Sequence, residues 1–135
     1  MTIELYELAG RDDRRFSPYC WRTRMALEHK GLKYKTIPVR FCDKRLIAFS
    51  KQDRVPVIRD GSRTVWDSWK IAEYLETTYR DCPSLFGGKP AQSLAQFLNV
   101  WVDRTLHGTL MRLIVADILD HVDLADRDYF IQSRT

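Results

Sequence analysis

The sequence is poor in cysteine and has no long hydrophobic run. Its three cysteines, Cys20, Cys42 and Cys82, are too far apart to form a Cys-x-x-Cys metal or redox pair, and their odd number argues against a disulfide framework. No apolar run approaches the roughly 20 residues needed to span a bilayer, and no charged-then-apolar leader opens the chain. We therefore expect a cytoplasmic protein that is neither exported nor inserted into a membrane.

The chain also has little net charge. Lysine and arginine number 22 against 18 acidic residues, and this excess of four is too small to favour a nucleic-acid partner without a basic stripe. Hydrophobic residues make up 44% and charged residues 30%, which is typical of a globular protein. We find no internal repeat or low-complexity tract. With 135 residues, the chain can hold one well-cored domain and part of another.

The clearest local signals lie in residues 16–32. Ser17 suits a helix cap, Pro18 suits the first helical position because it has no N–H to lose, and Gly31 suits a left-handed helix end. These signals predict a helix over residues 18–30. Because a helix start concentrates unpaired N–H donors, an anion or a thiolate beside Ser17 would be stabilised there.

Ser17-Pro18-Tyr19-Cys20 is similar to the Cys-Pro-Tyr-Cys site of glutaredoxins, with serine at the first position. That first position does the chemistry in glutaredoxins, so a reactive sulfur would have to arrive here with a ligand. For Cys20 we consider two interpretations, a buried small residue or a thiol able to form mixed disulfides.

The next elements alternate between strands and helices. Strands are predicted over 3–8 and 34–39, followed by a short helix over 43–49 with Asp43 as its cap. The Asp60-Gly61 pair between two apolar-rich runs predicts a hairpin of antiparallel strands. A helix with Ser68 as its cap should then run to about Tyr79.

This order, β-α-β-α-β-β-α, favours a thioredoxin-like α/β domain over residues 1–82. Residues 83–90 are rich in turn formers and are interpreted as a linker. From residue 91 to 135 the pattern is helical and indicates an incomplete all-α domain, with a break near Gly108 and another helix beginning at Tyr129.

The all-α part carries a broad apolar face from Leu94 to Leu119. Covering it would bury about eight large side chains, at roughly 1.5 to 3 kcal/mol each. We therefore expect a second copy in a homodimer, a swapped partner, or further chain of a longer protein to cover this face.

Three segments together resemble cytosolic glutathione S-transferases. Ser17-Pro18-Tyr19-Cys20 with Arg24, Ala26-Leu27 and Lys30-Gly31-Leu32 resembles the family's first βα unit. Its glutathione-binding segments are resembled by Arg54-Val55-Pro56-Val57 and by residues 67–75. The resemblance covers residues 2–86 and implies a C-terminally truncated member. Trp21-Arg22-Thr23 and His29-Lys30-Gly31 are most similar to bacterial β-etherase-like members, which cleave aryl ethers of lignin fragments with glutathione.

The resemblance implies that Ser17 stabilises the glutathione thiolate. One hydrogen bond from a hydroxyl to a charged sulfur, roughly 1.5 to 3 kcal/mol, together with the helix start, is enough to lower a thiol pKa by about two units. The alternative is a purely structural role, in which Ser17 only caps the helix. In the family, a cis bond before Pro56 turns the backbone of Val55 toward the cysteinyl unit of glutathione.

The remaining site residues follow from the same resemblance. Asp67 and Ser68 fall where the family holds the γ-glutamyl end, although both can serve as caps alone. Arg54, with Lys51, could meet the glycine carboxylate, although long basic side chains are usually just solvated. No metal ligand is predicted, because nothing near His107 offers metal-ligand spacing.

Residues outside these motifs have two interpretations each. Arg11, Arg14 and Arg15 either are solvated or make the mouth of the pocket positive. His107 is a residue of the helix surface or a catalytic group. The electrophile is not identified by the sequence, since the all-α domain supplies only its first helices.

Two function classes remain open. The first is a glutathione transferase that uses the bound thiolate against a hydrophobic electrophile, with an aryl ether as one candidate. The second is a non-catalytic glutathione S-transferase-like binding or regulatory module. Glutathione is the co-substrate in the first class. Ser17, Pro56 and Asp67-Ser68 together favour the enzyme, whereas truncation favours a chain that is inactive or depends on a partner.

Overall fold

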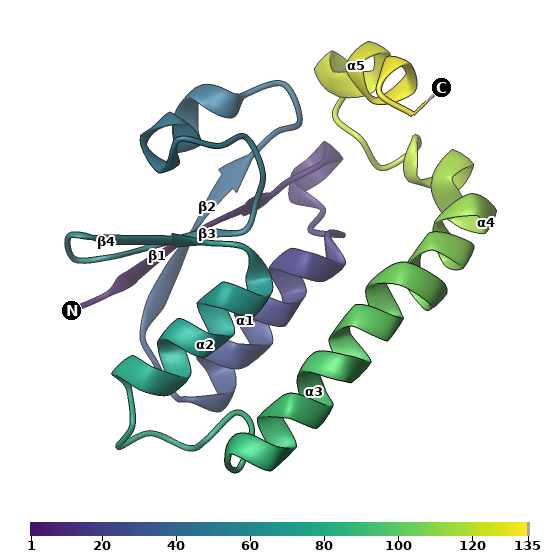
Figure 1. Cartoon of the computed structure of the whole chain (residues 1–135). Coiled ribbons are helices and arrows are strands. Elements are labelled where there is room, and N and C mark those ends of the chain that lie inside the picture. Colours follow the sequence, from purple (N-terminus) through teal and green to yellow (C-terminus); the bar gives the residue numbers. More distant parts are fainter. Residues whose placement is uncertain (135) are drawn as a thin grey trace.

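The computed structural model describes residues 1–134 and has a four-stranded mixed sheet at its centre (Figure 1). The strands are β1 (Ile3–Leu8), β2 (Tyr34–Val39), β3 (Val57–Asp60) and β4 (Arg63–Trp66), in the spatial order β2-β1-β3-β4. β1 pairs parallel with β2 and antiparallel with β3, and β3 pairs antiparallel with β4. This is the predicted thioredoxin-like arrangement, in which a helical crossover joins the parallel pair and a hairpin completes the sheet.

Two helices, α1 (Pro18–His29) and α2 (Ser68–Thr78), lie side by side on one face of the sheet (Figure 1). The core beneath them is formed by side chains with no or almost no exposed surface, which are Ile3, Leu5, Ala26, Leu27, Ile58, Ile71 and Leu75. A second cluster on the sheet includes Ile47 from the 3₁₀ segment η2 (Lys44–Ser50). The sheet is thus packed on both faces.

Helix α1 has the two ends that its sequence predicts. The Ser17 hydroxyl oxygen accepts a hydrogen bond from the Cys20 N–H at 3.3 Å, and Pro18 occupies the first turn. At the other end Gly31 has a φ of +65°. The Leu32 N–H donates to the Leu27 carbonyl at 3.1 Å, which is the pattern of a Schellman ending.

Three local predictions need correction. Asp43 precedes a 3₁₀ segment and its side chain makes no capping hydrogen bond. The predicted hairpin is present, but its turn is shifted by one residue, because Asp60 pairs with Arg63 and Gly61 has a φ of +58°. The last helix, α5, spans Arg127–Gln132 and so begins two residues earlier than predicted.

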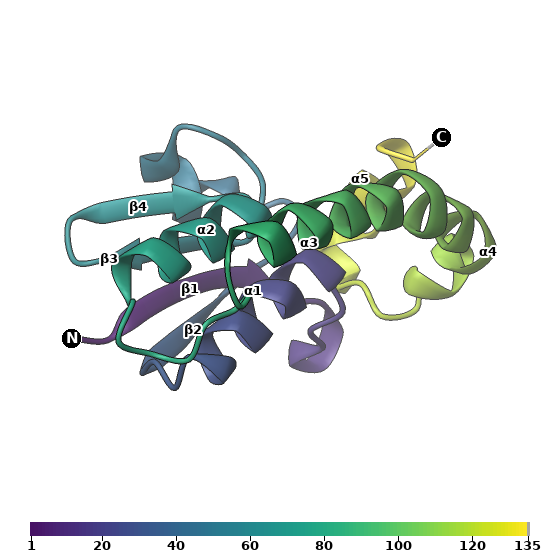
Figure 2. The ribbon, with the colours of Figure 1, turned by 60° about the horizontal axis from the view of Figure 1, so that its bottom comes forward.

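Residues 89–118 form one long helical rod that lies beside α1 and extends past the end of the sheet (Figure 2). It consists of α3 (Lys89–Trp101), the π-helical segment η3 (Val102–His107) and α4 (Gly108–Ile118). The predicted break near Gly108 is wrong, since this residue has helical angles. No residue of these three elements is buried, and large apolar side chains are 42–73% exposed at Leu94, Phe97, Leu98, Val100, Trp101, Leu106, Leu110, Leu113 and Ile114.

After the rod, the chain returns to the end of β2. Asp126, the last residue of the 3₁₀ segment η4 (Leu124–Asp126), is fully buried. Its carboxylate accepts hydrogen bonds from the N–H groups of Phe41 at 3.0 Å and Cys42 at 3.1 Å. Phe130 of α5 packs edge-on against Phe41. A buried carboxylate and an aromatic pair therefore connect the C-terminal segment to the sheet.

The charged loop after β1 is held by an acidic side chain that the sequence analysis did not identify. Glu7 is 1% exposed, and one of its oxygens accepts from Arg15 at 2.5 Å and also from Arg24. Arg15 donates to Asp13 as well. Arg15 is therefore neither simply solvated nor at the mouth of a pocket, because it is part of a buried ion-pair network under the start of α1.

Candidate functional site

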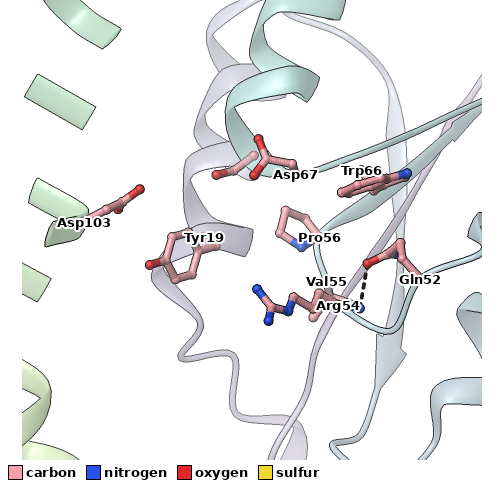
Figure 3. A pocket seen from close by; sticks show the side chains of 9 residues that line it. Tyr19, Gln52, Arg54, Val55, Pro56, Trp66, Asp67 and Asp103 are labelled. Carbon is pink, nitrogen blue, oxygen red and sulfur yellow. Dashed lines mark hydrogen bonds between the residues drawn. The ribbon is translucent and has the colours of Figure 1, made fainter. Parts of the chain in front are cut away.

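A cavity of about 320 Å³ opens where the starts of α1 and α2 approach the loop before β3 (Figure 3). This volume is at the lower end of the range for small-ligand pockets. The cavity is lined by residues from four separate segments, which are Tyr19, Gln52, Arg54, Val55, Pro56, Trp66, Asp67, Ser68 and Asp103. One cationic and two anionic side chains are among them, so the lining suits a ligand with charges of both signs.

The start of α2 forms one wall. Asp67, and not Ser68 as predicted, is the helix cap, because its Oδ1 accepts from the N–H groups of Trp69 at 3.0 Å and Lys70 at 3.1 Å. Asp67 has a φ of +74°, which a residue with a side chain seldom adopts. Ser68 is the first helical residue and is buried. A helix start with a buried hydroxyl is a ready site for an anionic group.

The loop before β3 forms the opposite wall. The Val55–Pro56 bond is cis, as the family resemblance implied. Val55 precedes the first residue of the β3–β4 ladder, Val57, by two positions. The loop is braced by Gln52, whose side-chain oxygen accepts from the Arg54 N–H at 2.7 Å and whose amide donates to the Ser50 hydroxyl at 2.7 Å. Backbone and side chains of this loop are thus held in place at the cavity.

The start of α1 contributes Tyr19, whereas Ser17 is half-buried and is not among the lining residues. Burial raises the pKa of Tyr19, and the nearby Asp103 raises it further, so the phenol stays protonated at neutral pH. Cys20 is 1% exposed, its sulfur accepts from the Leu8 N–H at 3.5 Å, and burial raises the pKa of its thiol. Of its two interpretations, the structure supports a buried small residue.

The rod supplies the fourth segment. Asp103 lines the cavity, and Arg22 of α1 donates to its Oδ1 at 2.7 Å. Arg22 also donates to the side-chain oxygen of Asn99 at 3.0 Å. The ring of His107 lies edge-on to that of Tyr19, with 5.3 Å between the centroids. These contacts fasten the rod to α1 beside the cavity.

The structure brings together five of the seven predicted site residues, which are Arg54, Val55, Pro56, Asp67 and Ser68. Ser17 lies two positions before the lining residue Tyr19. Lys51 is exposed, has a φ of +57° and does not line the cavity.

Four further lining residues were missed by the sequence analysis. Gln52 and Trp66 adjoin predicted positions and Tyr19 lies two positions after one, so proximity along the chain could have indicated them. Asp103 carries no local signal, because only the tertiary structure brings the rod to the cavity.

Residues 1–134 contain neither a metal-binding cluster nor a membrane-spanning helix. No group of three or more histidine, cysteine, aspartate or glutamate side chains could hold a metal ion. Over the same residues, no helix combines the length and the apolar character needed to cross a bilayer.

The part of the chain that supplies most of the cavity lining is similar to known proteins. Residues 16–78 match the family described as glutathione S-transferase, N-terminal domain. A probable glutathione S-transferase, parA, of Nicotiana tabacum is 27% identical over 101 residues, which cover 72% of this chain and 46% of the tobacco protein. The chain thus spans about half the length of this curated relative.

Solved structures resemble nearly the whole chain. Glutathione transferase GSTFuA2 of Phanerochaete chrysosporium is 29% identical with a TM-score of 0.88, over 99% of this chain and 60% of the fungal one. A glutathione S-transferase of Ceriporiopsis subvermispora, solved in complex with glutathione, is 26% identical with a TM-score of 0.84, over 99% of this chain and 59% of that one. The rod and the C-terminal segment are therefore similar to parts of these proteins as well.

Proposed function

We propose that this chain, whose residues 16–78 match the N-terminal domain of glutathione S-transferases, belongs to that family, binds glutathione in the 320 Å³ cavity and presents its sulfur as a thiolate to an electrophile. The observation that carries the proposal is the convergence of the Val55–Pro56 bend and the Asp67–Ser68 helix start on one cavity. A fungal relative was solved with glutathione bound.

The cavity offers a partner for each part of the tripeptide. The Ser68 hydroxyl and the first N–H groups of α2 receive the γ-glutamyl carboxylate, and Asp67 faces the γ-glutamyl ammonium group. The backbone of Val55 pairs with the cysteinyl unit in the manner of a strand edge. Arg54 meets the glycine carboxylate, with Lys51 as a more distant cation. The ammonium group of the ligand thus meets the carboxylate of Asp67, and its glycine carboxylate meets the guanidinium group of Arg54.

Ser17 is the proposed donor to the thiolate. Its oxygen accepts from the Cys20 N–H, which leaves the hydroxyl proton available for donation. Each unit of thiol pKa depression requires about 1.4 kcal/mol, and a hydrogen bond to a charged group supplies roughly 1.5 to 3 kcal/mol. One such bond beside a helix start therefore makes the thiolate abundant at neutral pH.

We propose a hydrophobic aryl ether as the electrophile, from the resemblance of Trp21-Arg22-Thr23 and His29-Lys30-Gly31 to β-etherase-like members. In that reaction the sulfur forms a bond to carbon while the carbon–oxygen bond breaks, and the leaving aryloxide takes a proton from water. The alternative is a binding or regulatory module that holds glutathione without turnover.

The exposed surface and the cysteines support a proposal about assembly and location. We propose that a second copy covers the apolar face of the rod, whose side chains are 42–73% exposed, and that the protein is a cytoplasmic homodimer. Its three cysteines are all free, which suits a reducing compartment. Light scattering that finds only monomers at micromolar concentration contradicts the dimer.

The division into a glutathione-binding domain (1–82), a linker (83–90) and the first helices of an all-α domain (91–135) remains a proposal. The last of these residues lies outside the described part of the chain.

The deciding experiment combines calorimetric titration with glutathione and turnover of a chromogenic electrophile and an aryl-ether dimer. Ser17→Ala should leave the dissociation constant nearly unchanged, raise the pKa of the bound thiol by about one to two units and lower turnover at neutral pH by roughly tenfold or more. Ser93→Ala, on the exposed face of α3, is the matched control. The pKa is read from the ultraviolet absorbance of the thiolate.

The outcomes separate the candidates. Tight binding of glutathione without turnover of either electrophile supports the module and contradicts the transferase. Turnover with an unchanged thiol pKa in Ser17→Ala removes Ser17 from the mechanism. A wild-type chain that binds no glutathione contradicts both functions.

A further inference from the structure

The loop between β1 and α1 ends at Ser17 and contains unusual backbone angles. In this loop Asp12 and Asp13 have φ values of +52° and +59°. A residue with a side chain seldom adopts such angles, and a strained backbone persists only where the surrounding structure holds it. The position of Ser17 therefore depends on the contacts that hold this loop.

Arg15 holds the loop through both its side chain and its backbone. Its guanidinium group donates to Oδ1 of Asp13 at 2.9 and 2.7 Å, and to the carboxylate of Glu7 at 2.5 Å. Its carbonyl oxygen accepts a hydrogen bond from the indole N–H of Trp21 at 2.7 Å. Glu7 belongs to β1 and Trp21 to α1. These bonds therefore connect the loop to the elements on both sides of Ser17.

Glu7 orients two arginines at once. The oxygen that binds Arg15 also accepts from Arg24, whose guanidinium carbon lies 4.9 Å from the centre of the Trp21 ring. Glu7 is 1% exposed, and among the described residues its second oxygen has no hydrogen-bond partner. An unpaired buried carboxylate oxygen costs free energy. Features that cost stability in this way are most often retained at functional sites.

The charge of Glu7 by itself disfavours an anion at the start of α1. Burial raises the pKa of the Cys20 thiol there, and the negative charge of Glu7 raises it further. By the same Coulomb effect, Glu7 disfavours a glutathione thiolate beside Ser17. Any favourable effect of Glu7 on the thiolate must therefore come from the geometry that it imposes.

We propose that Glu7 is a positioning residue for Ser17: it orients Arg15, which holds the loop so that the Ser17 hydroxyl reaches the sulfur of glutathione. This inference rests on the proposed role of Ser17 toward the thiolate. A hydrogen bond weakens steeply when its length or angle departs from the optimum. A small shift of the loop therefore weakens the bond to the thiolate, whereas the proposed partners of the tripeptide at 54–56 and 67–68 stay in place.

The test is a double-mutant cycle on the pKa of the bound thiol, read from the ultraviolet absorbance of the thiolate in the full chain saturated with glutathione. Glu7→Gln removes the charge and keeps the shape of the side chain. It should raise the thiol pKa by about 0.5 to 1 unit and lower turnover of a chromogenic electrophile at neutral pH by roughly three- to tenfold. The dissociation constant of glutathione should stay nearly unchanged. When Ser17→Ala is already present, Glu7→Gln should raise the thiol pKa no further.

Two further variants complete the cycle. Glu4→Gln, on the same strand and paired with Lys35, removes an equal charge away from the loop and should leave the thiol pKa unchanged. Trp21→Phe keeps an aromatic ring beside Arg24 and removes the N–H that binds the Arg15 carbonyl. It should raise the thiol pKa in the same direction as Glu7→Gln, and the cycle is read with Trp21→Phe if Glu7→Gln does not fold.

The outcomes separate the inference from the proposed function. A thiol pKa that falls or stays unchanged in Glu7→Gln contradicts the inference, and so does a rise that persists when Ser17 is absent. A loss of glutathione affinity as large as the loss of turnover makes Glu7 a purely structural residue and also overturns it. If Ser17→Ala itself leaves the thiol pKa unchanged, the proposed role of Ser17 fails and the inference fails with it. A wild-type chain that binds no glutathione overturns the proposed function as well.

Discussion

The thioredoxin-like part and the helical rod have similar helical patterns in sequence but opposite environments. In α1 and α2, apolar positions such as Leu27, Ile71 and Leu75 are fully buried against the sheet. In the rod, apolar side chains such as Phe97 and Leu113 are 66% and 73% exposed. An amphipathic pattern therefore shows which face of a helix needs cover, but does not show what covers it.

The difference has an energetic meaning. The free energy of unfolding of the thioredoxin-like part comes from contacts within one chain, so it should not depend on protein concentration. The apolar face of the rod contributes only when another surface covers it, and its contribution should then follow mass action. Three experiments test this contrast, and the one with the largest expected effect comes first.

Glu7→Ala should lower the free energy of unfolding by about 3–5 kcal/mol, because it leaves Arg15 and Arg24 without the buried carboxylate that binds both. Chemical denaturation followed by circular dichroism measures the change. Glu4→Ala, on the same strand but in a partly exposed pair with Lys35, is the control and should cost far less stability than Glu7→Ala. A loss for Glu7→Ala as small as the loss expected for Glu4→Ala would show that the network under α1 adds little stability.

Leu27→Ala and Leu113→Ala remove the same atoms from the two regions. Leu27→Ala should cost about 2–5 kcal/mol at every protein concentration, because it opens a cavity in a closed core. Leu113→Ala should change the stability of a dilute monomer by less than about 0.5 kcal/mol. Thermal unfolding over a hundredfold range of concentration distinguishes them. A concentration-independent loss of several kcal/mol for Leu113→Ala contradicts the contrast.

Acid should weaken the contacts of Glu76 with Ser84 and Leu85, which precede the rod in the chain. Burial raises the pKa of Glu76, but hydrogen bonds from the Leu85 N–H, the Ser84 hydroxyl and Lys30 outweigh this effect and lower it to about 2. A lowered pKa in the folded state means that this stability is fully present above about pH 4.5 and is lost as the pH falls toward 2. The loss should amount to about 2–3 kcal/mol.

Urea denaturation at pH 5 and at pH 2.5 measures this loss. Glu76→Gln should remove that part of the pH dependence, whereas Glu73→Gln, one helical turn earlier, should preserve it. An unchanged pH dependence in Glu76→Gln would mean that other carboxylates cause the acid sensitivity.

Much of the fold could be predicted because short-range signals were strong and agreed with one another. Ser17, Pro18 and Gly31 delimit α1 as expected, and the cis bond at Pro56 agrees with the family resemblance. The error at the start of α2 concerns two neighbouring residues with similar chemistry. Asp67 and Ser68 are both good caps, and the choice between them depends on which one leaves the helical backbone angles.

The rest of the site could not be predicted because it depends on distant segments. Asp103 reaches the cavity through contacts of Arg22 with residues about 80 positions further along the chain. Glu7 looks like an ordinary outward-facing residue of a strand, but it is buried because two arginines satisfy it. Such partners leave no periodic trace in a single sequence.

Local backbone preferences and side-chain alternation were sufficient to establish the thioredoxin-like order of elements and the ends of α1, and the family resemblance indicated the two segments that border the cavity. Folding in three dimensions decided which charges meet there, because electrostatic and hydrogen-bond partners are chosen by distance in space and not by position along the chain. The same reason explains the rod: its pattern requires a cover, and only the packing of a second surface can supply one.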